Sequence, residues 1–126
     1  FLQDIHTEMA EKFEVPLILH ICGRTVDRMP FIAETGMNAF HFDSKNSPQE
    51  AMDAVNNKIA LVGNINNPET LYSKGTEDVK KEVFDCLNAG VQIIAPECAI
   101  PLKTKSENLI AITEGVSDWL SEHNKN

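Results

Sequence analysis

Short apolar segments of strand length alternate with segments of helical periodicity along this sequence, and that alternation leaves few fold classes open. The apolar segments are residues 16–22, 38–43, 58–65 and 91–96. Each is a nearly continuous apolar run, which is typical of a strand buried on both faces of a parallel sheet. Helical periodicity covers residues 2–13, 25–35, 76–90 and 107–122, with further helix starts at 47–50 and 67–68. The sequence therefore predicts an α/β fold in which four parallel strands alternate with helices.

Residues that favour helix ends support several of these boundaries. Ser47, Pro48 and Glu50 are of the types preferred at the N-cap, N1 and N3 positions of a helix. Further helix ends are expected at Thr76 and Ser106 as N-caps, and at Gly36 as the C′ residue of the helix over 25–35.

Four strand–helix units amount to half of a (β/α)8 TIM barrel, which has about 250 residues. An open α/β sheet of four strands is the alternative. The sequence begins at Phe1 rather than at Met and enters a helical pattern directly. We therefore expect a piece of a longer protein, with residues 1–126 forming a single domain, and this favours the half barrel.

Composition and charge exclude several classes of partner. The 126 residues include 19 acidic and 11 basic side chains, with a formal net charge of −8. No cluster of Lys or Arg offsets this balance, which argues against nucleic acid or an anionic membrane as a partner. No apolar run approaches the roughly 20 residues that span a bilayer. Three cysteines are a sparse and odd number for a secreted disulfide scaffold, so we expect a cytoplasmic protein with reduced thiols.

Polar residues gather at the C-terminal ends of all four apolar segments. They are His20 and Cys22 in the first, Asp43 in the second, Asn64 in the third, and Glu97 and Cys98 after the fourth. Sites in parallel α/β folds are built at the carboxyl ends of the strands. These residues are therefore the candidates for a functional site.

His20 and Cys22 are two residues apart, so their side chains point to the same side of an extended strand. Cys98, at the end of another strand, would complete a set of one imidazole and two thiolates. Zinc favours this combination, and three protein ligands with an open fourth position are typical of a catalytic site. The alternative is that both cysteines are small buried apolar residues and that His20 is a hydrogen-bonded histidine at a strand end.

The other polar residues have both a functional and a structural interpretation. Asp43, our catalytic candidate, either accepts a hydrogen bond from a ligand imidazole or is a displaceable fourth ligand, or it caps the loop that follows. The Gly63-Asn64 pair either lets the backbone approach a ligand, which makes Asn64 a cofactor-binding candidate, or forms a plain turn. His41 faces either the barrel lumen or the helix layer. Glu97 is expected to support neighbouring residues or the loop, and Cys86 to lie in the core.

Two segments carry a resemblance to a known family: His20-Ile21-Cys22-Gly23 and Pro96-Glu97-Cys98-Ala99-Ile100-Pro101. They resemble motifs of the uroporphyrinogen decarboxylase-like superfamily, and within it those of the methylcobamide:coenzyme M methyltransferases of methanogenic archaea. Residues 62–65, 67–71 and 101–108 match the same pattern. The likeness covers nearly the whole chain and implies the C-terminal half of the family's (β/α)8 barrel. The true decarboxylases are metal-independent and lack the H-x-C…C motif, whereas the methyltransferases use it to hold zinc.

This resemblance implies that His20, Cys22 and Cys98 are zinc ligands and that Asp43, where relatives can carry Glu, fills the fourth position when substrate is absent. The implied reaction, a step of methanogenesis, transfers a methyl group from a methylated corrinoid on a separate protein to the thiol of coenzyme M. Zinc coordination removes the thiol proton. The thiolate then attacks the methyl carbon in line, and cobalt leaves as Co(I).

Two other functions remain open from the sequence. A decarboxylase-like enzyme acting on a tetrapyrrole would need no metal, and His20 and Cys22 argue against it. A module that binds a metal or a corrinoid protein without turnover is the third possibility. Half a barrel exposes unpaired strand edges, through which two copies could pair as a homodimer. We predict that this chain alone binds zinc and has little or no methyltransferase activity.

Overall fold

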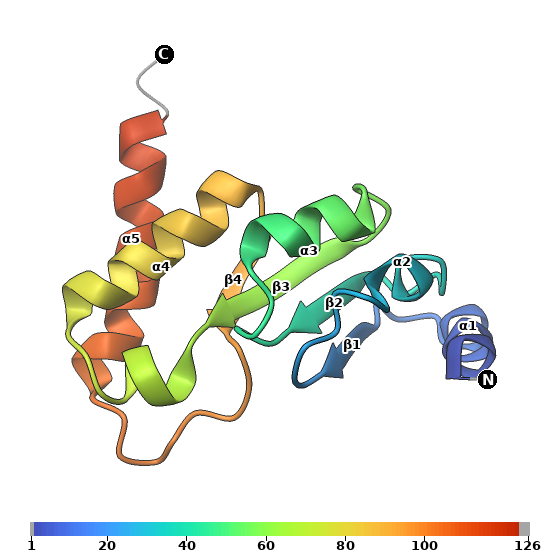
Figure 1. The fold of residues 1–126 in the computed structure, drawn as a ribbon, viewed down its shortest axis with the longest axis horizontal. Coiled ribbons are helices and arrows are strands. Elements are labelled where there is room, and N and C mark those ends of the chain that lie inside the picture. Colours follow the sequence, from blue (N-terminus) through green and yellow to red (C-terminus); the bar gives the residue numbers. More distant parts are fainter. Residues whose placement is uncertain (1, 124–126) are drawn as a thin grey trace.

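Four parallel strands in sequence order form one sheet in the computed structural model, which describes residues 2–123 (Figure 1). The strands are β1 (Ile18–Ile21), β2 (Ala39–Phe42), β3 (Ala60–Ile65) and β4 (Ile93–Pro96). Each strand pairs with the next one along the chain, so no strand is skipped. This confirms the predicted sheet, although each strand is shorter than its apolar segment.

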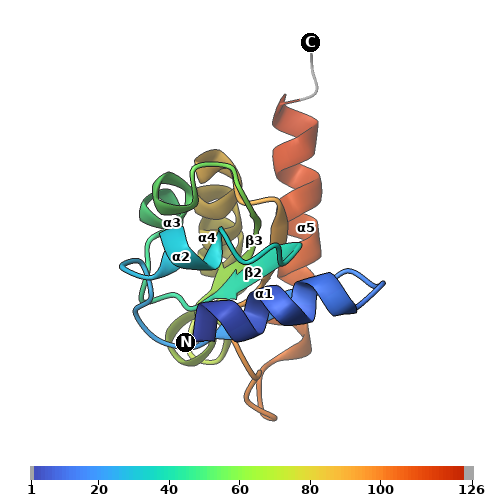
Figure 2. The ribbon, with the colours of Figure 1, turned by 90° about the vertical axis from the view of Figure 1, so that its right-hand side faces the viewer.

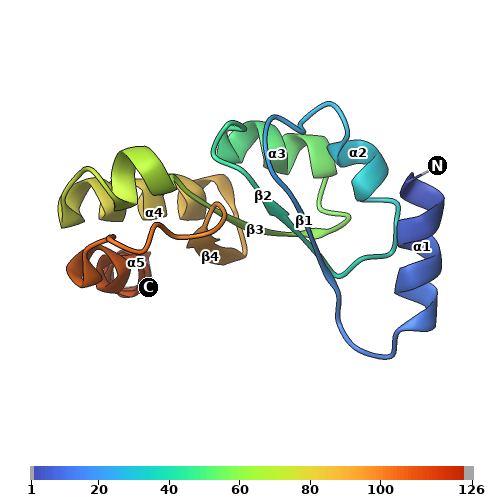
Figure 3. The same ribbon diagram turned by 90° about the horizontal axis from the view of Figure 1, so that it is seen from below.

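Helices alternate with the strands, beginning with one that precedes β1. They are α1 (Leu2–Lys12), α2 (Met29–Ile32), α3 (Pro48–Val55), the π-helical turn η1 (Asn67–Leu71), α4 (Thr76–Ala89) and α5 (Ser106–His123). Neighbouring helices contact each other in the series α2, α3, α4 and α5, and α4 packs along α5. Seen from below, the helices α2, α3 and α4 lie along one side of the strands (Figure 3). Strands and helices that advance together are the arrangement expected of an arc of a (β/α)8 barrel.

The hydrophobic core lies between the strands and this helix layer. Phe40 and Phe42 of β2 are fully buried, and so is Leu61 of β3. Because side chains alternate along a strand, His41 lies on the opposite face from the two phenylalanines. That opposite face is more open, since Ile18 of β1 is 57% exposed and Ile93 of β4 is 46% exposed. In a barrel this face lines the interior.

The first helix has a different environment from the others. The predicted helix over 2–13 forms as α1 but has no buried residue. Its apolar side chains Leu2, Ile5 and Met9 are 40–62% exposed. In Figure 2, which looks toward the end of the molecule where Figure 1 places α1, this helix lies in front of β2. Among residues 2–123, no helix is long and apolar enough to cross a membrane.

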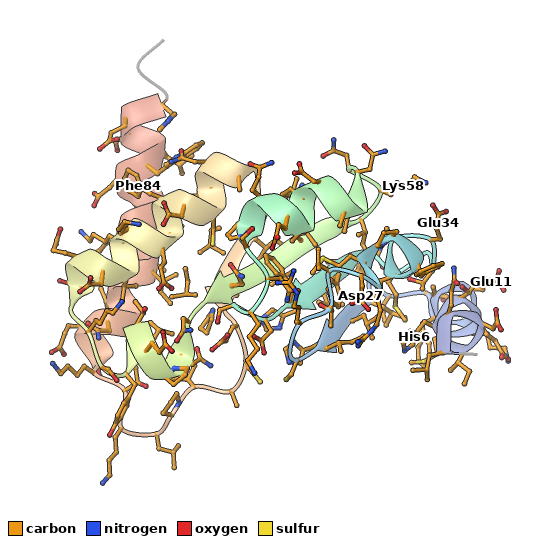
Figure 4. The ribbon with its side chains drawn as sticks, viewed as in Figure 1. His6, Glu11, Asp27, Glu34, Lys58 and Phe84 are labelled. Atoms are coloured by element: carbon orange, nitrogen blue, oxygen red, sulfur yellow. The ribbon has the colours of Figure 1, made fainter. Side chains whose placement is uncertain are left out.

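The helix predicted over 25–35 is the main error in the secondary structure. Only α2 is helical, and its C-cap is Ala33 rather than Gly36. The backbone N–H groups of Thr25 and Val26 donate to Oδ1 of Asn46, at 2.8 and 3.0 Å, and these bonds hold residues 25–28 in a turn. After α2, an ion pair between Glu34 and Lys58 joins this segment to the turn before β3 (Figure 4).

The helix starts agree with the capping residues in one of three cases. Ser47 is the N-cap of α3, and a capping box with Glu50 is present. Thr76 is instead the first residue of α4, whose N-cap is Gly75; the N–H of Gly75 donates to Asp78. Ser106 is likewise the first residue of α5. Both predictions therefore placed the start of the helix one residue too late.

Candidate metal centre

The ends of β1 and β4 bring one imidazole and two thiols together. Nε2 of His20 lies 3.1 Å from Sγ of Cys22, and Sγ of Cys22 lies 3.4 Å from Sγ of Cys98. Ligand atoms of all three residues lie within 4.8 Å of one another. His20 and Cys22 are exposed and Cys98 is half-buried, so the group is open to solvent. Three residues that the sequence placed at the ends of two strands therefore converge at one point.

The backbone fixes which nitrogen of His20 faces the cysteines. Nδ1 of His20 lies 3.1 Å from the carbonyl oxygen of His41. A carbonyl oxygen only accepts, so Nδ1 carries the proton and donates this hydrogen bond. In the neutral ring Nε2 then has a free lone pair, directed toward Cys22. Such an outer hydrogen bond is the usual way in which a metal-binding histidine is oriented.

The thiols share their surroundings with carboxylates. The pKa of Cys22 is raised above its ordinary value, chiefly by the hydrogen bond with Cys98 and then by desolvation and the negative charges of Asp43 and Glu97. Ionising both thiols here therefore concentrates negative charge. A divalent cation would offset that charge and favour the thiolate forms.

Both carboxylate oxygens of Asp43 accept hydrogen bonds from backbone N–H groups. Its Oδ2 accepts from the N–H of Gly23 at 2.7 Å, and its Oδ1 accepts from the N–H of Lys45 at 2.9 Å. Partial burial acts to raise the pKa of Asp43, but these two hydrogen bonds, together with a hydrogen bond to Glu97 and the charge of Lys45, outweigh it and the pKa is lowered. The carboxylate therefore stays ionised and links the turn after Cys22 to the loop after β2.

Glu97 joins the loops that follow β2, β3 and β4. Its side chain is 7% exposed. Oε2 accepts from the N–H of Ser44 at 2.8 Å, and Oε1 accepts from the N–H of Asn67 at 2.9 Å. The N–H of Glu97 itself donates to the carbonyl of Ile65 at 2.9 Å. The residue immediately before Cys98 is thus fixed to two other strand ends, which agrees with the supporting role expected of it.

Asn64 faces the protein's own backbone. It is 5% exposed, and its Nδ2 donates to the carbonyl oxygens of Asn46 at 2.8 Å and Asp43 at 3.3 Å. Its Oδ1 accepts from the thiol of Cys86 at 3.3 Å. Cys86 is 2% exposed, as the core prediction requires, and burial raises its pKa to about 11. Asn64 therefore supports the loop that carries Asp43.

The close approach expected at Gly63 is to another strand. Gly63 has a φ of +139°, and a Cβ atom at this position would lie 2.9 Å from the carbonyl oxygen of Phe42. Only glycine fits such a conformation and such a contact. The neighbouring backbone of β2 is what requires a glycine here.

Two further residues organise the centre: His41, whose orientation the sequence left open, and Asn46, which sequence reasoning missed. The ring of His41 lies against His20 with centroids 4.5 Å apart, and its Nε2 lies 2.7 Å from the carbonyl oxygen of Pro96. Asn46 is fully buried and binds the backbone of Gly23, Thr25 and Val26. A polar residue within an apolar strand is a signal for His41, whereas the local sequence around Asn46 contains none.

Comparisons with known proteins agree with this fold and identify the family. The sequence profile of the uroporphyrinogen decarboxylase (URO-D) family matches residues 1–119. The chain is 32% identical over 109 residues to methylcobamide:CoM methyltransferase MtbA of Methanosarcina acetivorans, covering 86% of this chain and 32% of that protein. It is 28% identical over 120 residues to methylcobamide:CoM methyltransferase MtaA of Methanosarcina barkeri, covering 94% of this chain and 35% of that protein.

A solved methyltransferase from Methanosarcina mazei superposes on the chain with a TM-score of 0.91 at 26% identity, covering 94% of this chain and 36% of that one. The chain therefore spans about a third of the length of the relatives it matches. A profile match over nearly all of its residues decides the family. The chain belongs to the uroporphyrinogen decarboxylase family.

Proposed function

We propose that this chain carries the zinc site of an enzyme that transfers a methyl group from a methylated corrinoid to the thiol of coenzyme M. The convergence of His20, Cys22 and Cys98 at the carboxyl ends of parallel strands is the observation that carries the proposal. The names of the relatives, which are methylcobamide:CoM methyltransferases, support the same reaction.

The donor atoms present fit zinc. Two thiolates and an imidazole are preferred zinc ligands, and ligand atoms of a tetrahedral zinc ion lie roughly 3.5–3.8 Å apart. The distances of 3.1 Å from His20 to Cys22 and 3.4 Å between the sulfurs need only a small expansion. Zinc bound here would supply an open position at which a substrate thiol loses its proton.

The chain's own residues orient this site. The carbonyl of His41 holds His20 with Nε2 toward the cysteines. Asp43 stays ionised beside the thiols, where it is available as a displaceable ligand. The other role considered for Asp43, accepting a hydrogen bond from the ligand imidazole, does not fit, because Nδ1–H of His20 donates to the carbonyl of His41. The contacts of Asn64 favour support of the 43–46 loop over direct contact with a cofactor.

The remaining parts of the proposal concern context. Residues 1–126 are taken as one domain that forms the C-terminal half of the family's barrel. The partners are coenzyme M and a methylated corrinoid protein, and pairing of two copies through strand edges is a separate proposal. Free Cys22 and Cys98 favour a reducing compartment, so we place the reaction in the cytoplasm.

A metal-independent decarboxylase acting on a tetrapyrrole is the second candidate, because the matching profile is that of uroporphyrinogen decarboxylases. Zinc content separates the two proposals. We expect about one zinc ion per chain by elemental analysis, with zinc lost in the Cys22→Ser/Cys98→Ser variant. The Cys86→Ala variant is the matched control, since it removes a buried thiol outside the group and should keep zinc. A folded chain that takes up no zinc after reconstitution would contradict the methyltransferase proposal.

A further inference from the structure

We propose that His41 is a positioning residue that aligns two of the three ligands, a role that rests on the proposed zinc site. Its carbonyl oxygen fixes the ring of His20. Its imidazole fixes the end of β4 from which Cys98 follows. Both contacts come from one residue in the middle of β2.

The first contact follows from strand register. His20 of β1 is paired with His41 of β2, so the two side chains lie side by side on the same face of the sheet. Their ring centroids are 4.5 Å apart and the ring planes are inclined by 43°. The Nδ1–H of His20 donates to the carbonyl of His41, while the His41 ring packs against the His20 ring and restricts its rotation. His20 is therefore held in both tautomer and orientation.

The second contact crosses the inner face of the sheet. Nε2 of His41 lies 2.7 Å from the carbonyl oxygen of Pro96, and because a carbonyl only accepts, Nε2 is the donor. β3 lies between β2 and β4, so this bond spans a strand. Alternate strands of a (β/α)8 barrel place their inward side chains in the same layer, which explains how His41 reaches β4. Cys98 is two residues beyond the carbonyl that His41 holds.

Together these contacts fix the distance between His20 and Cys22 on one side of the centre and Cys98 on the other. His20 and Cys22 come from β1, and Cys98 comes from β4 at the other edge of the sheet. His41 contacts His20 directly, and it contacts β4, the strand that precedes Cys98, through the carbonyl of Pro96. Losing the imidazole should leave the fold intact but let β4 and Cys98 shift relative to His20.

The test compares His41→Phe, which keeps an aromatic ring, with His41→Gln, whose amide N–H can replace Nε2–H as a donor to Pro96. Zinc affinity is measured by competition with a chromophoric chelator, and the ligand geometry by the visible spectrum of the Co(II)-loaded chain. We expect His41→Phe to weaken zinc binding about 10- to 100-fold and to alter the Co(II) bands. His41→Gln keeps a donor to Pro96 but not the ring against His20, so it should lose clearly less affinity than His41→Phe. His6→Phe, on α1, is the control and should change neither readout (Figure 4).

Unchanged zinc affinity and Co(II) spectrum in His41→Phe would overturn the inference, and so would an equal loss in His41→Gln. If the unsubstituted chain binds neither metal, the proposed zinc site fails and this inference fails with it. If a variant does not fold, the hydrogen bonds of His41 and His20 can still be tested by NMR on the unsubstituted chain. Imidazole ¹⁵N NMR should find the proton on Nε2 of His41 and on Nδ1 of His20, and the opposite tautomer for either ring would refute the assignment.

Discussion

Replacing Glu97 by Gln should destabilise the chain strongly although the two side chains have the same shape. Glu97 is 7% exposed, and its carboxylate accepts backbone hydrogen bonds from Ser44 at 2.8 Å and Asn67 at 2.9 Å. An amide keeps one accepting oxygen but turns an NH2 group toward the other N–H. The variant therefore loses one charge-assisted hydrogen bond and leaves a buried donor facing a donor.

The magnitude follows from these two effects. A hydrogen bond to a charged group contributes about 1.5–3 kcal/mol, and a buried unsatisfied donor costs about 1–3 kcal/mol. Taking the lower part of both ranges, we expect a loss of about 3 kcal/mol. For a chain of this size that loss lowers the melting temperature by roughly 10 °C.

The assay is urea unfolding followed by far-UV circular dichroism, with a chelator present so that metal binding does not contribute. Glu11→Gln, on the exposed surface of α1, is the matched control and should change the free energy of unfolding by less than about 0.5 kcal/mol (Figure 4). An equally small change in Glu97→Gln would refute the reasoning, because it would mean that the carboxylate does not hold the two loops.

Three further predictions concern other parts of the chain. Gly63→Ala should lower the free energy of unfolding by about 2 kcal/mol or more, measured by urea unfolding, because its Cβ would meet the carbonyl of Phe42 and its φ disfavours a side chain. Cys86, with a pKa raised to about 11, should resist alkylation at pH 8 in the native chain and react in urea, as mass spectrometry would report. Its unfolded thiol ionises first as pH rises from about 9 toward 11, so stability should fall over that interval. Hydrogen bonds with Asp118 and then Glu114 raise the pKa of Lys80, so the stability they give is present below its ordinary pKa and is lost as pH rises through the folded value. Lys80→Met should therefore lower the melting temperature at neutral pH, and less so in high salt.

The alternation of strands and helices could be predicted because it is a local property of the sequence. Periodicity located all four strands, and Ser47 located the start of α3 from its own side chain. The helix over 25–35 could not be predicted correctly, because its first residues bond to Asn46, about twenty positions further along the chain. A bond between distant segments outweighed a favourable helical pattern there.

The candidate ligands could be predicted from the sequence, but the contacts of the residues that support them, His41 and Glu97, could not. His20, Cys22 and Cys98 differ from the apolar strands around them, and parallel topology brings strand ends to one edge. The role of His41 depends on strand register, because a shift of one residue would turn its ring toward the helices. The contacts of Glu97 depend on backbone N–H groups, which every sequence has and which composition cannot locate.

The residues that support this centre bond mainly to backbone groups, so we expect the site to be ordered in the metal-free chain. The carbonyl of His41 holds His20, the imidazole of His41 holds the backbone of Pro96, and Glu97 holds the loops on either side. Backbone positions are set by the sheet, so the fold holds the three candidate ligands, His20, Cys22 and Cys98, together before any ion binds. Metal binding then costs little ordering of the chain, and the loops should be as protected from hydrogen exchange without zinc as with it. Protection that appeared only on adding zinc would show instead that the ion itself organises the strand ends.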